Sequence, residues 1–227
     1  MNKSANHTRI NNILLGPIER PILQWLAVHS PKWMNPDIYT AIGVSGSVIT
    51  LVGYILSRFN PGYFWLATFG FFVNWYGDSM DGTLARCRHI ERPVYGYFVD
   101  HIIDVIGQVL IFIGLGLSPY VSFNIACLAL VAFLLMSVLV YLRTYVVGEF
   151  KLSYGKLGPT EARVVAVMLN TAMFFFGKQI WHVKINVLGD VAVNPYEIIV
   201  GLVALLLLYF FITTAFKESI RLAKAGH

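Results

Sequence analysis

Long apolar runs alternate with short polar stretches along most of the chain. At about 1.5 Å per residue, a helix formed by each run is long enough to cross a hydrocarbon core of about 30 Å. The pattern therefore predicts an all-α integral membrane protein with six transmembrane helices. These spans are expected at Tyr39–Ser57, Phe64–Asp81, Tyr97–Leu117, Val121–Val147, Glu161–Gly177 and Glu197–Phe216.

The segment before the first predicted span has a different pattern. Ile10–His29 mixes isoleucine, leucine and tryptophan with charged residues such as Glu19 and Arg20. A helix with this mixture is typical of the membrane interface, where it lies in the plane of the bilayer. We therefore expect an N-terminal segment, residues 1–38, that carries an interfacial amphipathic helix. A six-helix transmembrane domain, residues 39–227, would follow it.

The composition agrees with a bilayer as the solvent of this protein. Apolar residues make up 57% of the chain and charged residues only 13%, whereas a soluble domain carries about 25% charged residues. The net charge is +5, but the basic residues fall between the apolar runs and form no continuous basic face. That distribution speaks against nucleic acid as a partner.

The basic residues also predict the orientation in the membrane. Six spans put both termini on one side, and 14 of the 17 lysine and arginine residues would lie on that side. The positive-inside rule makes it the cytoplasmic side. The 14 residues are Lys3, Arg9, Arg20, Lys32, Arg86, Arg88, Arg92, Arg143, Lys151, Lys156, Arg163, Lys217, Arg221 and Lys224, and the opposite side holds Arg58, Lys178 and Lys184.

Four carboxylates lie within two of the predicted spans. Asp78 and Asp81 close the second span, and Asp100 and Asp104 lie in the third. Acids at membrane depth are costly, so they are usually paired, face a cavity or bind a ligand. Spacings of three and four residues put each pair on one face of its helix. We expect the four to converge on one pocket, although pairing with nearby arginines is an alternative for any single acid.

Small residues continue the same helix faces. Gly82 lies four residues after Asp78, and Gly96 lies four residues before Asp100. Ala85 lies four residues after Asp81. Two helices would thus present carboxylates beside stretches with little side chain, where a ligand can approach the backbone.

The type of donor group predicts the type of metal. Carboxylates without histidine or cysteine partners favour a hard cation such as Mg²⁺ or Mn²⁺. Two divalent ions would offset four negative charges, and a pair of ions about 3.5–4 Å apart is a common clamp for displacement at phosphorus. Arg86 and Arg88 are close enough in sequence to hold phosphate oxygens by forked hydrogen bonds.

The acidic and small residues together form an extended motif. It reads D-x-x-D-G-x-x-A-R, then nine residues, then G-x-x-x-D-x-x-x-D. This motif resembles that of the CDP-alcohol phosphotransferase family, the class I CDP-alcohol phosphatidyltransferases. Its fixed positions are Asp78, Asp81, Gly82, Ala85, Arg86, Gly96, Asp100 and Asp104.

The resemblance implies a fold, a site and a reaction. The fold is a six-helix transmembrane domain that is catalytic, preceded by an interfacial helix and commonly assembled as a homodimer. The four aspartates would hold two divalent ions, and the cytidine diphosphate moiety would lie over Gly82, Ala85 and Gly96, with Arg86 beside it. Asp104 would act as general base on an acceptor hydroxyl, which attacks phosphorus while CMP leaves.

The family divides on its donor, and two features here are similar to one branch. His101 follows Asp100 directly, and Tyr154-Gly155-Lys156 precedes Thr160-Glu161. Both features favour CDP-choline or CDP-ethanolamine as donor and diacylglycerol as acceptor, although Ile102 replaces the glycine usual after the histidine. The alternative is CDP-diacylglycerol as donor, with inositol phosphate, glycerol phosphate or serine as acceptor.

Several further residues have more than one interpretation. His101 and Glu161 are candidates for acid–base catalysis. Alternatively, His101 orients a metal-bound carboxylate and Glu161 stabilises a helix N-terminus. Asp37 stands where the family usually has asparagine, and we expect it to cap the first span or to contact the donor. The basic residues near spans four and five would fix topology, contact lipid headgroups or hold an acceptor phosphate. They are Arg143, Lys156 and Arg163.

A different class of function would use the same acids. A divalent-cation transporter also needs carboxylates in the membrane, but transporters often carry repeated, interrupted helices, and the sequence has no visible repeat. A purely structural membrane protein would leave the clustered carboxylates unexplained.

Overall fold

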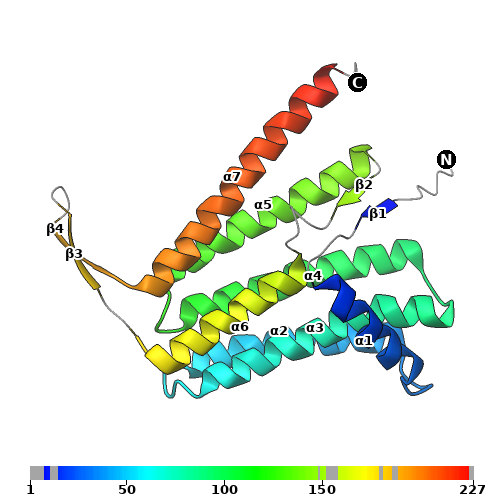
Figure 1. Cartoon of the computed structure of the whole chain (residues 1–227), viewed down its shortest axis with the longest axis horizontal. Helices are drawn as coiled ribbons and strands as arrows, with labels where there is room; N and C mark the ends of the chain where they lie inside the picture. The colour runs from blue at the N-terminus through cyan, green and yellow to red at the C-terminus, as the bar shows by residue number, and fades with distance from the viewer. Residues whose placement is uncertain are drawn as a thin grey trace.

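The structure is a computed structural model that describes residues 8–10, 15–147, 149–151, 158–178, 181–185 and 189–224. Helices dominate this part of the chain (Figure 1). They are α1 (Gly16–Val28), α2 (Pro36–Leu56), α3 (Tyr63–Arg88), α4 (Pro93–Leu117), α5 (Phe123–Val147), α6 (Pro159–Phe176) and α7 (Pro195–Lys224).

Two short strand pairs accompany the helices. β1 (Thr8–Ile10) pairs in parallel with β2 (Glu149–Lys151), and β3 (Trp181–Ile185) pairs antiparallel with β4 (Gly189–Val193). The all-α prediction therefore holds for the helical body but missed these two pairs.

Each of the six predicted spans coincides with a helix, but the helices are not equally apolar. α2, α4, α5 and α7 are long and apolar enough to cross a membrane. α3 and α6 do not reach the same apolar content among the described helices, because polar residues such as Asn74 and Arg163 interrupt them. The helices thus identify a membrane protein, and the count of six spans stays a prediction.

Several helix ends differ from the predicted ones. α1 begins at Gly16, and Ile10 lies in β1, so the predicted Ile10–His29 helix was too long at its N-terminal end. α3 continues to Arg88 and α4 begins at Pro93. These longer helices also include Gly82, Ala85 and Gly96, so the small residues of the motif share the helical geometry of the acids.

α2 and α3 pack at unusually short range because glycines line their contact. A Cβ atom added at Gly53 would lie 2.5 Å from the backbone nitrogen of Ala67, and one added at Gly77 would lie 2.2 Å from that of Gly43. Small residues allow the backbones of membrane helices to approach in this way. The approach brings polar groups of α2 within reach of α3.

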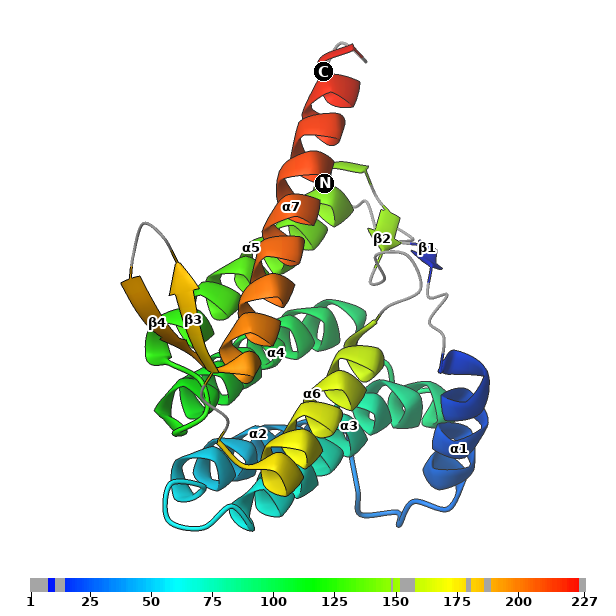
Figure 2. The ribbon, with the colours of Figure 1, turned by 60° about the vertical axis from the view of Figure 1, so that its left-hand side comes forward.

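α6 is fixed against this pair by buried hydrogen bonds. The hydroxyl of Tyr54 donates to Oδ1 of Asn170 at 2.9 Å, and Nδ2 of Asn170 donates to the hydroxyl of Thr68 at 3.2 Å. On the other side of the molecule, α7 packs along α5 (Figures 1 and 2). An ion pair between Arg143 and Glu218, 2.8 Å long, joins these two helices.

The α2–α3 contact predicts that Gly53→Ala destabilises the protein. The added methyl group would meet backbone atoms of Ala67, and overpacking of this kind costs about 1–3 kcal/mol. Thermal unfolding in detergent should show the loss. Gly201→Ala in α7 is the matched control, because no atom lies within 4 Å of its added Cβ. Equal stability of the two variants would contradict the close contact.

Candidate functional site

A pocket of about 1280 Å³ opens where the C-terminal half of α3, the N-terminal half of α4, α1 and the start of α6 meet. The pocket is lined by all eight fixed positions of the motif. Its lining includes Asp78, Asp81, Gly82, Ala85, Arg86, Gly96, Asp100, His101, Asp104 and Arg163.

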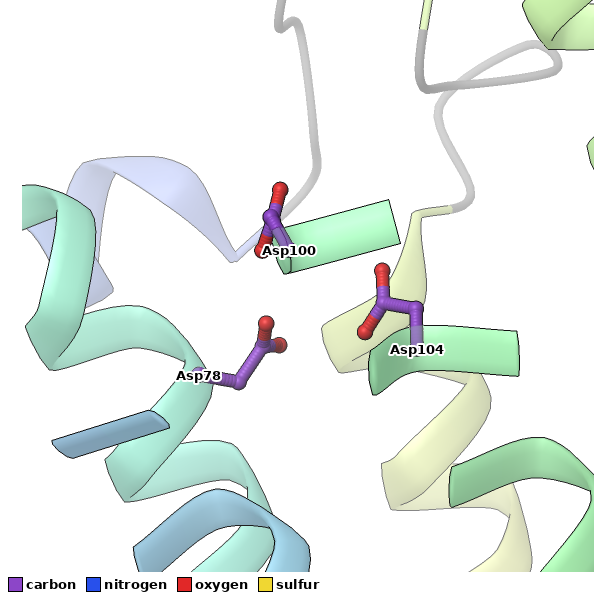
Figure 3. Close-up of side chains that lie close together, drawn as sticks. All are labelled: Asp78, Asp100 and Asp104. Atoms are coloured by element: carbon purple, nitrogen blue, oxygen red, sulfur yellow. The ribbon is translucent and has the colours of Figure 1, made fainter. Parts of the chain in front are cut away.

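Three of the four aspartates form a triad. One carboxylate oxygen from each of Asp78, Asp100 and Asp104 lies within 4.8 Å of the other two (Figure 3). α3 supplies Asp78, and α4 supplies the other two. Opposite oxygen ligands of one Mg²⁺ lie about 4.2 Å apart, twice the usual Mg–O distance. The triad therefore fits a small divalent cation with little adjustment.

Asp81 lines the same pocket but lies outside the triad. Its Oδ2 accepts a hydrogen bond of 2.8 Å from the hydroxyl of Thr40 on α2, and its Oδ1 accepts one from the backbone N–H of Gly82. The predicted convergence of four acids is thus a triad with a fourth acid beside it. The sequence could not show this difference, because it depends on the approach of α2.

Arg163 is a site residue whose contact the sequence reasoning missed. Its Nη2 donates to Oδ2 of Asp78 at 2.6 Å, and its Nε donates to Oδ1 of Asn74 at 2.9 Å. The interpretations as topology determinant, headgroup contact or phosphate ligand did not include these partners. A usable signal was present, because an arginine in an apolar segment needs a partner for the same reason as the aspartates.

Glu19 joins α1 to the wall of the pocket. Its carboxylate accepts hydrogen bonds from Trp75 Nε1 at 2.8 Å, from Ser79 Oγ at 3.1 Å and from Thr160 Oγ1 at 3.2 Å. Ile18 and Trp25, on the same helix, are about two-thirds exposed. α1 is therefore amphipathic as predicted, and it also closes one side of the pocket.

The predicted ligand-facing glycines leave open space. A Cβ added at Gly96 would meet no atom within 4 Å, and one added at Gly82 would meet only the flexible end of Arg86. Packing between helices does not require glycine at either position, unlike at Gly53. Arg86 lines the pocket and donates to the hydroxyl of Thr83 at 3.2 Å. Arg88 does not line the pocket and donates to the backbone carbonyls of Ser30, Pro31 and Met34.

His101 lines the pocket between two aromatic rings. It stacks on Tyr97 with centroids 4.0 Å apart and lies 4.7 Å from the ring of Tyr141. Its Nδ1 lies 2.7 Å from the carbonyl oxygen of Tyr97 and 3.6 Å from Oδ2 of Asp100. The ring is therefore positioned by Tyr97, and the distance to Asp100 exceeds hydrogen-bond length.

Glu161 is engaged at the start of α6. Its Oε1 accepts a hydrogen bond from the backbone N–H of Leu15 at 2.9 Å, and its Oε2 accepts one from that of Gly158 at 2.8 Å. The side chain is buried and does not line the pocket. This geometry favours the helix-capping interpretation over the catalytic one.

Asp37 does not cap α2, so that prediction was wrong. The cap is Asn35, whose Oδ1 accepts from the backbone N–H of Ile38 at 2.9 Å, because α2 begins at Pro36 and not at Tyr39. Asp37 instead forms an ion pair with Arg92.

The other basic candidates differ in their surroundings. Arg143 forms the ion pair with Glu218 that joins α5 to α7 and does not line the pocket. Lys156 lies outside the described residues, as do Tyr154, Gly155 and Lys3.

Comparison with known proteins adds two findings. The family model of CDP-alcohol phosphatidyltransferase matches residues 33–216. Cholinephosphotransferase 1 of Gallus gallus is 29% identical over 184 residues, which cover 78% of this chain and 54% of that protein. Cholinephosphotransferase 1 of Danio rerio is 28% identical over 177 residues, which cover 73% and 44%.

The chain spans about half the length of these relatives. The family model matches most of this chain, since the match runs from before α2 to within α7 and includes the whole acidic motif. This protein belongs to the CDP-alcohol phosphatidyltransferase family.

Proposed function

We propose that this protein is a phospholipid-synthesising CDP-alcohol phosphotransferase. It transfers a substituted phosphoryl group from a CDP-linked donor to the hydroxyl of an alcohol and releases CMP. The observation that carries the proposal is the carboxylate triad of Asp78, Asp100 and Asp104, which lies in a pocket that also contains the open glycine positions.

The proposed metal ligands are the four aspartates of the motif, Asp78, Asp81, Asp100 and Asp104. Two Mg²⁺ or Mn²⁺ ions held there would stabilise negative charge on the phosphates of the donor. Oxygen-only ligands suit these cations. Asp81 would have to share its carboxylate between a cation and the hydroxyl of Thr40.

The donor site lies beside these acids. Gly82, Ala85 and Gly96 give the pocket a wall with little side chain, so a nucleotide diphosphate can approach the backbone closely. Arg86 lines the same wall and is suited to pair with a phosphate by a forked hydrogen bond.

Asp104 is the proposed general base. It lies one turn further along α4 than Asp100 and lines the same pocket. Its carboxylate would accept the hydroxyl proton of the acceptor as the new oxygen–phosphorus bond forms and the bond from phosphorus to CMP breaks. His101 is a second candidate for this proton, because Tyr97 positions its ring in the pocket wall. We assign Glu161 no part in the chemistry, since two backbone N–H groups occupy its carboxylate.

The proposed donor is CDP-choline or CDP-ethanolamine, and the proposed acceptor is diacylglycerol. The sequence features around His101 favour this branch, and the relatives are named cholinephosphotransferases. CDP-diacylglycerol with inositol phosphate, glycerol phosphate or serine is the alternative.

The topology and assembly are also proposals. Both termini and the pocket would face the cytoplasm, because 14 of the 17 basic residues fall on that side of a six-span arrangement. The catalytic unit would include α1 as well as the transmembrane domain, because Glu19 contributes to the pocket. The homodimer stays a prediction from the family resemblance.

Removing two acids should abolish the reaction. The double variant Asp100→Asn/Asp104→Asn loses two of the three triad carboxylates, and we expect CMP release from any CDP-linked donor to fall at least about 100-fold. Glu197→Asn is the control. Oε1 of Glu197 accepts a hydrogen bond from the backbone N–H of Ser122, just before α5, and this acid does not line the pocket. Activity surviving in the double variant would refute the proposed site.

A side chain at Gly96 should obstruct the donor without harming the fold. Gly96→Val adds atoms to open space, so thermal stability should stay close to that of the wild type. An obstruction worth about 1–3 kcal/mol raises the KM for the CDP-linked donor about 5- to 150-fold. Gly201→Val, also in open space but on α7, should leave KM unchanged. An unchanged KM in Gly96→Val would remove Gly96 from the donor site.

A substrate comparison tests the branch. Purified protein with Mg²⁺ or Mn²⁺ would receive CDP-choline, CDP-ethanolamine or CDP-diacylglycerol, each with its matching acceptor. We expect CMP from the first two with diacylglycerol. CMP from CDP-diacylglycerol alone would select the other branch. Ion flux into liposomes with no CMP from any donor would favour the transporter instead.

A further inference from the structure

We propose that Arg163 and Asn74 act as a positioning pair that holds the carboxylate of Asp78 in the orientation needed to bind a divalent cation. This inference rests on the proposed function, because it assumes that the triad is a metal site. It adds two residues outside the motif, one of them on a helix that the motif does not include.

Asn74 has its orientation fixed by α2. Its Nδ2 donates to the backbone carbonyl of Gly43 and to the hydroxyl of Ser47, each at 3.0 Å. Since the amide nitrogen faces α2, the amide oxygen faces the opposite way and accepts from Nε of Arg163 at 2.9 Å. These three contacts agree on one assignment of the amide oxygen and nitrogen.

Arg163 then connects Asn74 to Asp78. One planar guanidinium group donates through Nε to Asn74 and through Nη2 to Oδ2 of Asp78 at 2.6 Å. The side chain is only 16% exposed, which limits the competition of water for both contacts. A lysine at this position has the same charge, but its single ammonium group lacks the fixed fork that spans both partners.

The backbone that carries Arg163 is itself held in place. One turn toward the start of α6, Thr160 donates to Glu19 of α1. Two turns further along the helix, Asn170 is bonded to Tyr54 and Thr68. α6 therefore presents the guanidinium group from a fixed position.

Asp78 needs such support more than its partners do. It is the member of the triad that α3 supplies, and it reaches across to Asp100 and Asp104 of α4. Like charges repel one another strongly in a partly buried site, so an unsupported Asp78 would turn away. Groups that hydrogen-bond a metal-ligating carboxylate fix its direction, and their loss typically weakens metal binding about 10- to 100-fold.

Direct Mn²⁺ binding to the purified protein, without substrate, tests this role. We expect Arg163→Lys and Asn74→Ala each to weaken Mn²⁺ binding about tenfold. Because the two residues act on Asp78 as one unit, the double variant should bind no more weakly than the weaker single variant. If Arg163 acted only through its charge, Arg163→Lys would bind Mn²⁺ like the wild type, and that result would overturn the inference.

Two controls separate the possible causes of failure. Asn170→Ala removes a buried asparagine of α6 that bonds α2 and α3 but does not touch Asp78, so it reports the cost of loosening α6. It should leave Mn²⁺ affinity within about twofold, far from the loss expected at Arg163. Equal loss in Asn170→Ala would make the effect one of packing and overturn the inference.

Asp78→Asn shows whether the wild type uses the triad at all. Mn²⁺ binding by the wild type that Asp78→Asn removes, together with unchanged binding in Arg163→Lys and Asn74→Ala, would leave the metal site standing and reject the positioning pair alone. No Mn²⁺ binding by the wild type would reject the metal site, and the positioning pair with it.

Discussion

The close approach of α2 and α3 is the constraint on which the site depends. Glycines on both helices let the backbones come together, so that a Cβ at Gly46 would lie 2.2 Å from the backbone nitrogen of Asn74. At that distance, short polar side chains can bridge two helices. Thr40 reaches Asp81, and Asn74 reaches the carbonyl of Gly43. Contacts with α2 thus fix the polar side chains of α3 in position without any bound ligand.

The charges of the pocket show a second consequence of this packing. Four acids of the motif line one pocket, and two of them have neighbours that limit the energetic cost of their charge. Asp81 accepts from Thr40 and from a backbone N–H group, and Asp78 pairs with Arg163. Ligand-free acids in a membrane protein are tolerated only with such compensation. Polar contacts from α2, α3 and α6 therefore hold these two acids in place within the pocket.

The sequence predicted the helices and the faces of the acids well, because both follow from local periodicity. Apolar runs located all six long helices, and the spacing of Asp100 and Asp104 put both on the face that meets Asp78. The missed contacts of the site share one physical cause. The partners of Asp81, Arg163 and Glu161 lie 41, 85 and 146 residues away in the chain, and no local pattern records such a contact. The error at Asp37 was of another kind, since it followed from placing the first turn of α2 three residues late.

The hydrogen bonds between Glu19 of α1 and α3 bear on the depth at which the pocket would lie in a bilayer. Ile18 and Trp25 of α1 are exposed, as is typical of a helix at the level of the lipid headgroups, and Glu19 of the same helix is hydrogen-bonded to Trp75 and Ser79. If α1 lies in the membrane interface as the sequence predicts, these bonds would keep the mouth of the pocket at the boundary between water and hydrocarbon. The proposed substrates, a water-soluble nucleotide and a molecule with two acyl chains, would then meet there without either leaving the medium in which it dissolves.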